Sequence, residues 1–542
     1  MLFTIFFALV AISAVDAEFD LGIGDDSDLF NFVTRPELRA PRFNVTVYDA
    51  NRVTPGYWFV APYASIVQQT QPKRYYQACQ TGPAIYDGAG NLVWSGACEF
   101  RNQNTCDFRP FRSNGSDHLS AILYGWELDR KGRGIIMDSS YEVSHSINVP
   151  RAERSMNMHE MQMANDGKTA MYIIHKSDWV DISELSPFGI QEEAGWVFNI
   201  GFREVEIDTG KALFEWWALD HVPLSTSSVE IDGLDGPPPA GWNFFHMNSV
   251  DKNADGDYMI SARYTDCIYK ISGTDGHIIW RLGGDESSFA LDAFNFSKQH
   301  DARFIEQNAT TTVISFLDNA SDGVNNVTSD VSTSYLVALE TSVTPMVARV
   351  IRRWSRPDGH LSHARGNFQL LPNGNAFTAW SGNAYITEHA FDGDLVMEAG
   401  FASERFVTYR SYKHNFTGHP SEPPTLKAYA YGTSPATSTT VCYVSWNGAT
   451  EVDSWDFYRN NSASEPIGRA QKTGFETMFQ ATGYYPDVYA QAISASGQVL
   501  GRSSVQLTVK SQDWQSQHTY KSQNVLSGLL TSEWPLLKSY GL

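Results

Sequence analysis

The stretch HMNSVDKNADGDYMISARYTDCIYKISGTDGHIIWRLGG, residues 246–284, decides the fold class of this 542-residue chain. Short runs of β-branched and aromatic residues alternate in it with Asp-Gly turns, the strongest short-range signal of a β-hairpin. It is predicted to form strand, turn, strand, short loop, strand, turn and strand. HARGNFQLLPNGNAFTAWSGNAYITEHAFDGDLVMEAG, residues 363–400, has the same order. Four antiparallel strands that recur about every fifty residues are typical of a β-propeller blade.

Shorter echoes of this unit start at His159 and His300, and aromatic residues make up 13% of a chain with 41 glycines. Such a composition favours strands and turns over helices. The sequence therefore predicts an all-β chain, with a β-propeller of about six four-stranded blades over residues 18–419. After a linker that begins near Gly418, strand spacing predicts a small fibronectin-III-like or Ig-like β-sandwich over residues 425–510. The structure of the C-terminal tail, residues 511–542, stays open.

The first residues, MLFTIFFALVAISAVDA, have the length and the small terminal residues of a secretory signal peptide. We predict that residues 1–17 are removed, because about 20 apolar residues are needed to span a bilayer as an anchor. No later stretch is predicted to span a membrane. The protein is therefore expected to be secreted or to stay in the lumen of the secretory pathway. N-glycosylation is predicted at eight sequons: Asn44, Asn114, Asn295, Asn308, Asn319, Asn326, Asn415 and Asn460.

Five cysteines in an oxidising compartment allow two disulfides, with a local bridge among Cys79, Cys98 and Cys106. No metal site and no cofactor is predicted: DKNADGD, from Asp251, resembles the start of an EF-hand loop but has Ala262 where that motif needs glutamate, so we interpret it as a hairpin turn. The formal net charge of -21 argues against a nucleic-acid partner. An anionic substrate would need a local basic cluster. The oligomeric state is left open.

Four histidines stand near the beginning of a blade-like unit, ahead of its first strand: His159, His246, His300 and His363. Because the first strand of a blade is innermost, we expect these side chains to meet near the propeller axis. Arginines in the same segments could supply the positive charge, with Arg303 favoured, then Arg263, and with Arg281 and Arg365 also in position. For any one of these histidines, a surface loop position is the alternative.

The stretch FHMNSVDKNADGDYMISARYTDCIYKISGTDGHIIWRLGG, followed by QHDARF and FLDN, resembles the arylsulfotransferase (ASST-type) family in its eukaryotic, largely fungal branch. LLPNGNAFTAW and VSWNGATEV are similar to that branch as well. The resemblance implies a β-propeller enzyme that moves a sulfuryl group between phenols without the nucleotide donor PAPS, through a covalent histidine intermediate. His246 and His300 match the motifs, and His363 is the candidate nucleophile. The sequence departs from the family in two places: no arginine follows FLDN closely, and Tyr264 stands where a histidine often follows SAR.

The leading hypothesis is thus a secreted aryl sulfotransferase-like enzyme with a small phenolic substrate. Two alternatives remain. One is a cyclase, isomerase or lyase that uses the same histidines on a secreted or vesicular metabolite. The other is a glycan- or protein-binding propeller, because the fold does not determine the function.

Overall fold

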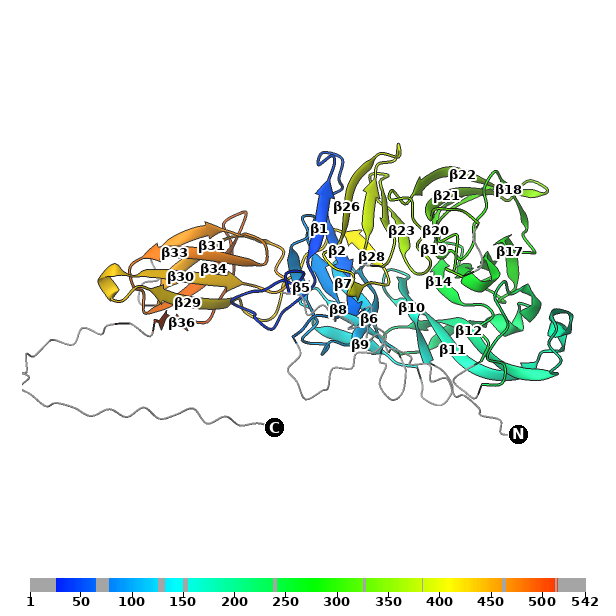
Figure 1. The fold of residues 1–542 in the computed structure, drawn as a ribbon, viewed down its shortest axis with the longest axis horizontal. Coiled ribbons are helices and arrows are strands. Elements are labelled where there is room, and N and C mark those ends of the chain that lie inside the picture. Colours follow the sequence, from blue (N-terminus) through cyan, green and yellow to red (C-terminus); the bar gives the residue numbers. More distant parts are fainter. Residues whose placement is uncertain are drawn as a thin grey trace, which may run out of the picture.

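The computed structural model describes residues 26–64, 78–124, 132–149, 155–236, 241–324, 328–382, 384–460, 465–511 and 514. In this part of the chain every regular element is a β-strand or a short 3-10 helix, so the predicted all-β class is confirmed. The strands form a large body, β1–β28, and a small one, β29–β37 (Figure 1). The proposed signal peptide and nearly all of the C-terminal tail lie outside the described residues. The described residues contain no helix with the length and apolar character of a membrane span.

Six sheets of four or five strands make up most of the large body, and one strand of each faces a common axis. These innermost strands are β6 (Asn104–Ser113), β10 (Ser155–Ala164), β14 (Met247–Lys252), β19 (His300–Gln307), β23 (Asn367–Leu370) and β28 (Ser411–His414). Each contacts the next one in chain order, and β28 contacts β6. The six strands therefore close a ring, the arrangement of a β-propeller.

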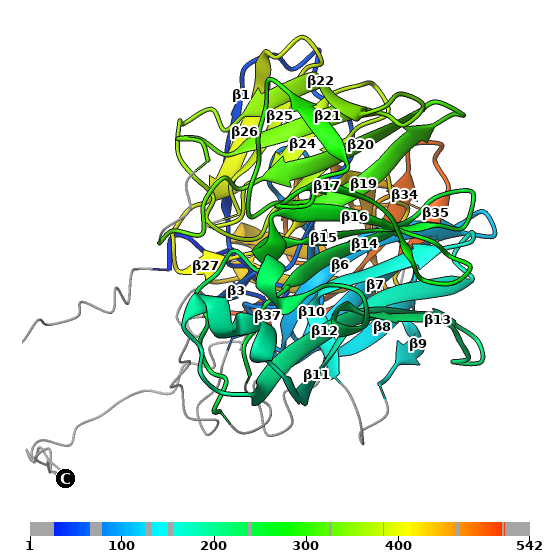
Figure 2. The ribbon, with the colours of Figure 1, turned by 90° about the vertical axis from the view of Figure 1, so that its right-hand side faces the viewer.

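The other strands follow outward from each innermost strand (Figures 1 and 2). They are β7 (Ser116–Tyr124), β8 (Arg133–Asp138) and β9 (Val143–Ile147) beside β6; β11 (Thr169–Asp181), β12 (Ala194–Glu206) and β13 (Ala212–Trp217) beside β10; β15 (Tyr258–Ala262), β16 (Cys267–Ile271) and β17 (Ile278–Gly283) beside β14; β20 (Thr311–Asp318), β21 (Thr333–Glu340), β22 (Met346–Ser355) and β18 (Phe289–Asp292) beside β19; β24 (Ala376–Ala379), β25 (Ile386–His389), β26 (Leu395–Phe401) and β1 (Phe43–Val47) beside β23; and β2 (Tyr57–Val60), β4 (Ala84–Tyr86) and β5 (Leu92–Ser95) beside β28.

The two quoted repeats form their sheets as the sequence predicts. Residues 246–284 supply β14 to β17, and residues 363–400 supply β23 to β26. Asn253 and Asp257 close the turn between β14 and β15, so the EF-hand-like stretch is a hairpin. The unit at His159 differs, because β10 begins at Ser155 and places His159 inside the strand.

Two antiparallel pairings join the beginning of the chain to later strands. β2 pairs with β28, with Tyr57 opposite His414, and β1 pairs with β26. A third, smaller pairing joins β3 (Tyr63–Ala64) to β27 (Phe406–Val407). The ring is thus fastened by strands from both ends of the large body.

Apolar side chains fill the space between successive sheets rather than the axis itself. One cluster packs β11–β13 against β14–β16 and contains Trp216 and Tyr258; another packs β20 and β21 against β23 and β24 and contains Trp380. Because the cores lie between the sheets, the innermost strands are free to carry polar side chains.

The small body has two sheets around a core that includes Trp455 and Phe457. One sheet contains β29 (Thr425–Tyr431), β30 (Thr439–Ser445), β33 (Glu476–Thr482) and β37 (Val509–Lys510), and the other contains β31 (Val452–Arg459), β32 (Gly468–Gln471), β34 (Asp487–Ser494), β35 (Val499–Arg502) and β36 (Gln506–Leu507). It docks on the large body through Gly448, whose N–H donates to the Val93 carbonyl at 2.8 Å and whose carbonyl accepts from the Tyr141 hydroxyl at 2.7 Å. Gly448 has φ +98°, and a Cβ there would lie 2.3 Å from the Tyr141 ring.

One disulfide, Cys79–Cys98, is present among the described residues, where the cysteine count allowed two. Cys106, Cys267 and Cys442 are buried free thiols, each in a different sheet. They cannot pair with one another without large movements of the backbone.

Candidate active site

Irregular backbone at the innermost strands brings polar side chains to the axis. The pairing of four of these strands is interrupted by extra residues: β6 between Cys106 and Arg109, β10 between Met156 and Met161, β14 between Met247 and Ser249, and β19 between His300 and Arg303. In a regular strand successive side chains point to opposite faces, and a bulge breaks this alternation. Neighbours such as His300 and Asp301 can therefore both contribute to the axial region.

Three of the predicted histidines come together there, and we call them the imidazole cluster: His159, His246 and His300. The ring centroids of His159 and His246 are 4.9 Å apart. His300 is buried and within electrostatic range of both, while His159 and His246 are half-buried. Among the described residues no group of three His, Cys, Asp or Glu side chains has the arrangement of a metal site.

Hydrogen bonds assign a different tautomer to His246 than to the other two. The carbonyl oxygen of the Asn243 side chain accepts from the His246 backbone N–H, so its NH₂ group donates to Nδ1 at 3.0 Å and the ring proton lies on Nε2. In His300, Nδ1 donates to Oδ1 of Asn319 at 2.7 Å and contacts the Lys298 carbonyl at 3.1 Å.

Nε2 of His300 accepts the Arg365 backbone N–H at 3.3 Å. Nδ1 of His159 contacts Oδ1 of Asn157, which likewise leaves its proton on Nδ1. The cluster thus has one Nε2–H donor and two Nε2 lone pairs.

All three imidazoles are held neutral. Burial lowers the pKa of His246 to about 3, helped by the positive charge of Arg263. Burial, and then Arg263, hold the pKa of His300 well below its ordinary value. Burial also lowers the pKa of His159, followed by the neighbouring imidazoles His246 and His300. Neutral imidazoles are competent nucleophiles and bases.

Arg263 is a buried cation for which the described residues supply no hydrogen-bonded carboxylate, although Asp322 and Asp266 are near enough to favour its charged form. Within the described part of the chain, its guanidinium makes one hydrogen bond, from Nη2 to the His363 carbonyl at 2.7 Å, and its Nε is buried without a partner. Burial lowers its pKa. A guanidinium beside His246 and His300 that has no direct hydrogen bond to a carboxylate among the described residues is suited to an anionic ligand.

Arg303 differs from Arg263, because its guanidinium is fully occupied. It pairs with Glu160 at 2.6 Å and with Asp301 at 2.5 Å, and it donates to the Val250 carbonyl at 3.2 Å. The expectation that Arg303 is a substrate-binding arginine is therefore corrected: two carboxylates already neutralise it. Arg281, on the outermost strand β17, faces Glu286 at 3.7 Å and is remote from the axis.

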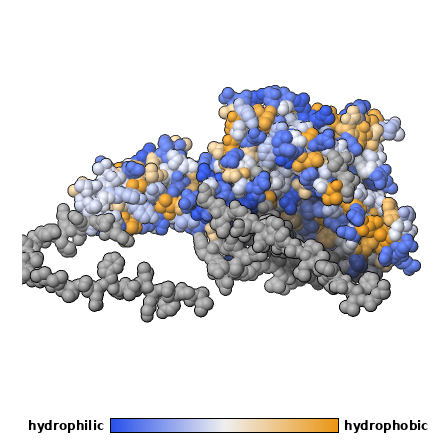
Figure 3. Space-filling view, in the orientation of Figure 1, coloured by the Kyte–Doolittle hydropathy of each residue, from blue (hydrophilic) through white to orange (hydrophobic). Residues whose placement is uncertain are grey.

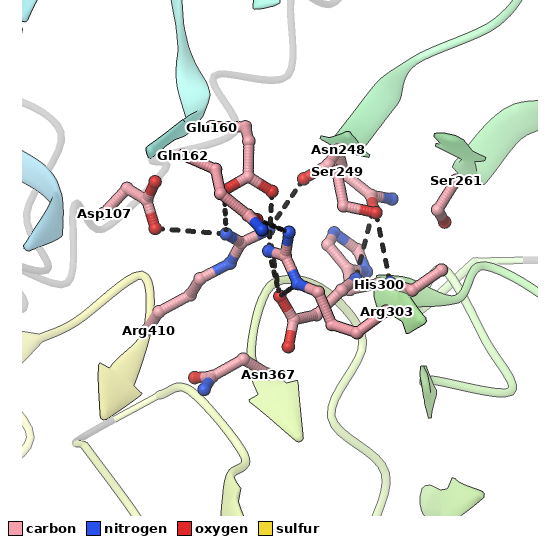
Figure 4. Close-up of polar contacts among 12 residues, drawn as sticks. Asp107, Glu160, Gln162, Asn248, Ser249, Ser261, His300, Arg303, Asn367 and Arg410 are labelled. Atoms are coloured by element: carbon pink, nitrogen blue, oxygen red, sulfur yellow. Dashed lines mark hydrogen bonds and ion pairs between the residues drawn. The ribbon is translucent and has the colours of Figure 1, made fainter. Parts of the chain in front are cut away.

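Arg303 belongs to a group of buried charges that we call the axial ion cluster (Figure 4). Arg410 lies within it, 3.1 Å from both Asp107 and Glu160. Burial opposes ionisation of Asp107, but Arg109 and Arg410 hold its pKa below the ordinary value. The members of the cluster are Asp107, Arg109, Glu160, Asp301, Arg303 and Arg410. Three cations balance three anions, so the cluster has no excess charge to attract a further ion.

His363, the candidate nucleophile from sequence, is placed apart from the imidazole cluster. Its side chain is exposed, and it precedes β23 by four residues, whereas His246 directly precedes β14 and His300 begins β19. The extra loop residues carry its ring outward. Only the His363 backbone takes part in the site, through its contact with Arg263.

Arg365 and two tyrosines complete the surroundings of the cluster, and the sequence analysis did not single out these tyrosines. The Arg365 guanidinium lies over the Tyr63 ring, 5.5 Å from its centroid. The Tyr409 ring is 5.4 Å from that of His159. The hydroxyl groups of Tyr63 and Tyr409 are buried without a partner among the described residues. Unsatisfied buried polar atoms beside reactive groups are typical of a ligand site.

Asn319 was predicted to be glycosylated, and the structure contradicts this. Its side chain is fully buried, and its Nδ2 donates to the carbonyls of Ser362 at 2.6 Å and Arg365 at 3.0 Å. A glycan on that nitrogen would have no room. Asn326 lies outside the described residues, and the remaining predicted sites are exposed: Asn44, Asn114, Asn295, Asn308, Asn415 and Asn460.

A closed ring of β-sheets with neutral imidazoles and a buried arginine near its axis defines the class: a propeller-like all-β protein with a candidate site lined by histidines. A family model described as arylsulfotransferase (ASST) matches residues 122–402, which include the whole imidazole cluster. The chain therefore belongs to the arylsulfotransferase family, and this membership supports an aryl sulfotransferase-like function.

Other comparisons add little. No curated protein matches the chain. Similar solved structures include a protein of unknown function from Bacteroides caccae (12% identity, TM-score 0.37, 66% of this chain and 99% of that one), streptogramin B lyase (9%, 0.28, 72% and 88%) and virginiamycin B lyase from Staphylococcus aureus (9%, 0.27, 66% and 99%). Similarities this low do not bear on the activity.

Proposed function

We propose that this protein is a secreted, PAPS-independent aryl sulfotransferase that passes a sulfuryl group from a phenolic sulfate ester to another phenol through a histidine. The six sheets are proposed to be the blades of one propeller, with the site where the axis opens. The observation that carries the proposal is the meeting of three neutral imidazoles with Arg263, a buried cation that is not hydrogen-bonded to a carboxylate among the described residues.

In the first step Nε2 of His300 gives up the hydrogen bond that it accepts from the Arg365 N–H, and its lone pair attacks the sulfur atom. The bond between sulfur and the aryl oxygen breaks, and its electron pair leaves with the phenolate. His300 is the best nucleophile of the three because sulfation at Nε2 makes its ring cationic, and Asn319 and the Lys298 carbonyl both face its Nδ1–H. Nε2–H of His246 donates a hydrogen bond to the departing oxygen, which lowers the energy of the developing negative charge.

In the second step the new phenol gives its proton to a base and its oxygen attacks the sulfur of sulfo-His300. The nitrogen–sulfur bond breaks and restores the neutral imidazole. His159 suits the role of base, since its Nε2 lone pair has no partner among the described residues. Arg263 neutralises charge on the sulfuryl oxygens in both steps, and loss of one such contact costs about 10²–10³-fold in rate.

The direct test uses purified protein with 4-nitrophenyl sulfate and phenol. Nitrophenolate release should be lost in His300→Ala and His246→Ala and reduced about 10²-fold or more in Arg263→Gln. His277→Ala is the matched control, because His277 is exposed on the turn before β17. Mass spectrometry of the quenched wild type should find one sulfuryl group on the peptide that contains His300.

Two results would count against the proposal. Release that persists in His300→Ala would remove the covalent role of His300. Absence of turnover with an array of aryl sulfates would favour one of the two alternatives instead: a cyclase, isomerase or lyase, or a non-catalytic binding propeller.

Export is proposed on separate grounds. The Cys79–Cys98 disulfide fits an oxidising compartment, and six predicted glycosylation sites are exposed. We expect the secreted protein to begin at or near Glu18. An intact residue 1 in the mature protein, with no glycans, would contradict export.

A further inference from the structure

Backbone hydrogen bonds to His300 and Asn319 hold Arg365 beside the imidazole cluster. Its backbone φ is +66°, in the left-handed region that residues other than glycine rarely adopt. Its N–H donates to Nε2 of His300, and its carbonyl accepts from Nδ2 of Asn319 at 3.0 Å. Strained backbone of this kind persists where its surroundings hold it in place.

The side chain of Arg365, in contrast, has no polar partner in the part of the chain that the structure describes. It is half-buried, lies over the Tyr63 ring and forms no ion pair there. The protein carries 61 acidic residues, so a partly buried arginine without a carboxylate is notable. The buried hydroxyl of Tyr63 is also without a partner. The two side chains together present a guanidinium, a phenol hydroxyl and an aromatic face.

Arg263 and Arg365 have different contacts beside the imidazole cluster: Arg263 donates to the His363 carbonyl, whereas the Arg365 guanidinium lies over the Tyr63 ring. Arg263 is the charged group that acts most strongly on His246 and His300. Burial raises the pKa of Tyr63, and the charge of Arg365 opposes this rise. The same charge lowers the pKa of His159, but less than burial and the neighbouring imidazoles do. A sulfate monoester carries one negative charge, which Arg263 can neutralise. Arg365 is then a second cation that the transferred group does not require.

We infer that Arg365 and Tyr63 form a second anion-binding subsite, and that the phenols used by this protein carry a further acidic group, a carboxylate or a second sulfate, away from the reacting oxygen. The inference rests on the proposed function. Because the sulfuryl group is held on the enzyme between two phenols, donor and acceptor occupy the same place in turn. The preference therefore applies to both.

The test compares two acceptors of the same shape, 4-hydroxyphenylacetate and its neutral amide, with 4-nitrophenyl sulfate as donor. In the wild type kcat/KM should be at least about 10-fold higher for the carboxylate, since hydrogen bonds to charged partners are the stronger ones. Arg365→Gln should bring the ratio of the two kcat/KM values to about one. Arg349→Gln, which changes an exposed arginine on β22, should leave the ratio as in the wild type.

The outcomes separate this inference from the proposed function. Equal use of both acceptors by the wild type overturns the inference, and so does an Arg365→Gln variant that loses both equally, because Arg365 would then serve the sulfuryl group. If no aryl sulfate is turned over, neither 4-nitrophenyl sulfate nor the sulfate ester of 4-hydroxyphenylacetate, the proposed function fails. Calorimetry then tests whether the subsite exists. 4-Hydroxyphenylacetate must bind the wild type at least about 10-fold more tightly than it binds Arg365→Gln. Equal binding to the two proteins overturns the inference. Thermal unfolding of Arg365→Gln verifies that it is folded.

Discussion

Nδ1 of His300 donates a hydrogen bond to Oδ1 of Asn319 at 2.7 Å, and Nδ2 of the same asparagine donates to the Ser362 carbonyl at 2.6 Å. One buried amide thereby fixes both the tautomer of His300 and the loop that leads to Arg365. The sequon Asn319-Ala320-Ser321 is thus part of the site and not a glycan acceptor.

Replacing Asn319 by alanine should lower kcat about 10–100-fold with little change in KM, because the imidazole loses the partner that holds its tautomer. Asn319→Asp places a negative charge at Nδ1, so the pH profile of kcat should shift to higher pH. A profile that does not move would indicate a purely structural role.

Asn295→Gln is the matched control for these variants. Asn295 begins a predicted sequon, as Asn319 does, but it is exposed. Its replacement should leave kcat unchanged and remove one glycan mass from the secreted protein, whereas Asn319→Gln should remove none.

The axial ion cluster should dominate the stability of the ring. Glu160→Gln leaves Arg303 and Arg410 buried with less compensation, and breaking a buried pair costs about 3–5 kcal/mol. Urea denaturation measures the loss. Arg349→Gln breaks exposed pairs with Asp292 and Glu340 and should cost at most about 1 kcal/mol. Equal effects of the two substitutions would refute a structural role of the cluster.

Acid should destabilise the fold through the imidazole cluster. The pKa of His246 is lowered to about 3, below its value of about 6.5 in an unfolded chain, so the unfolded state binds more protons between these pH values. The stability that His246 contributes is therefore complete above pH 6.5 and declines as the pH falls towards 3.

His246→Asn cannot take up this proton, so its unfolding free energy should fall less steeply between pH 7 and 4, by up to about 1.4 kcal/mol per pH unit. Parallel slopes for the variant and the wild type would contradict the lowered pKa. His145→Asn, at an exposed position on β9, is the control and should follow the wild type.

Thiol labelling tests the cysteine assignment. Without reductant, native protein should react slowly, because Cys106, Cys267 and Cys442 are buried and burial raises the pKa of each thiol to about 12. In denaturant three thiols per chain should react, and five after reduction. A single reactive thiol in denaturant would instead indicate a second disulfide.

Much of the strand pattern was predictable, because Asp-Gly turns and alternating runs are local signals. The stretch at 246–284 became β14 to β17, and His246 and His300 lie at the axis. Figure 3 shows hydrophilic residues spread over both bodies, which agrees with the excess of 61 acidic over 40 basic residues. The stretches that start at His246 and His363 contain the most complete sets of Asp-Gly or Asn-Gly turns, and this is why they are the clearest four-stranded units in the sequence.

The other site assignments depended on long-range contacts. Arg303 is neutralised by Glu160, which lies 143 residues earlier, and no local pattern reports that distance. Bulges such as the one after His300 break the alternation on which side-chain direction was predicted. His363 resembled the other histidines, but the longer loop before β23 puts Arg365 where an imidazole was expected.

The pairing of β2 with β28 has a consequence for how the protein is made. Residues around the imidazole cluster range from Tyr63 to Tyr409, and the last sheet is incomplete until His414 has been synthesised. A ribosome must therefore synthesise about three quarters of the chain before the ring of sheets can close, so the N-terminal strand β2 waits for its partner β28 through most of translation.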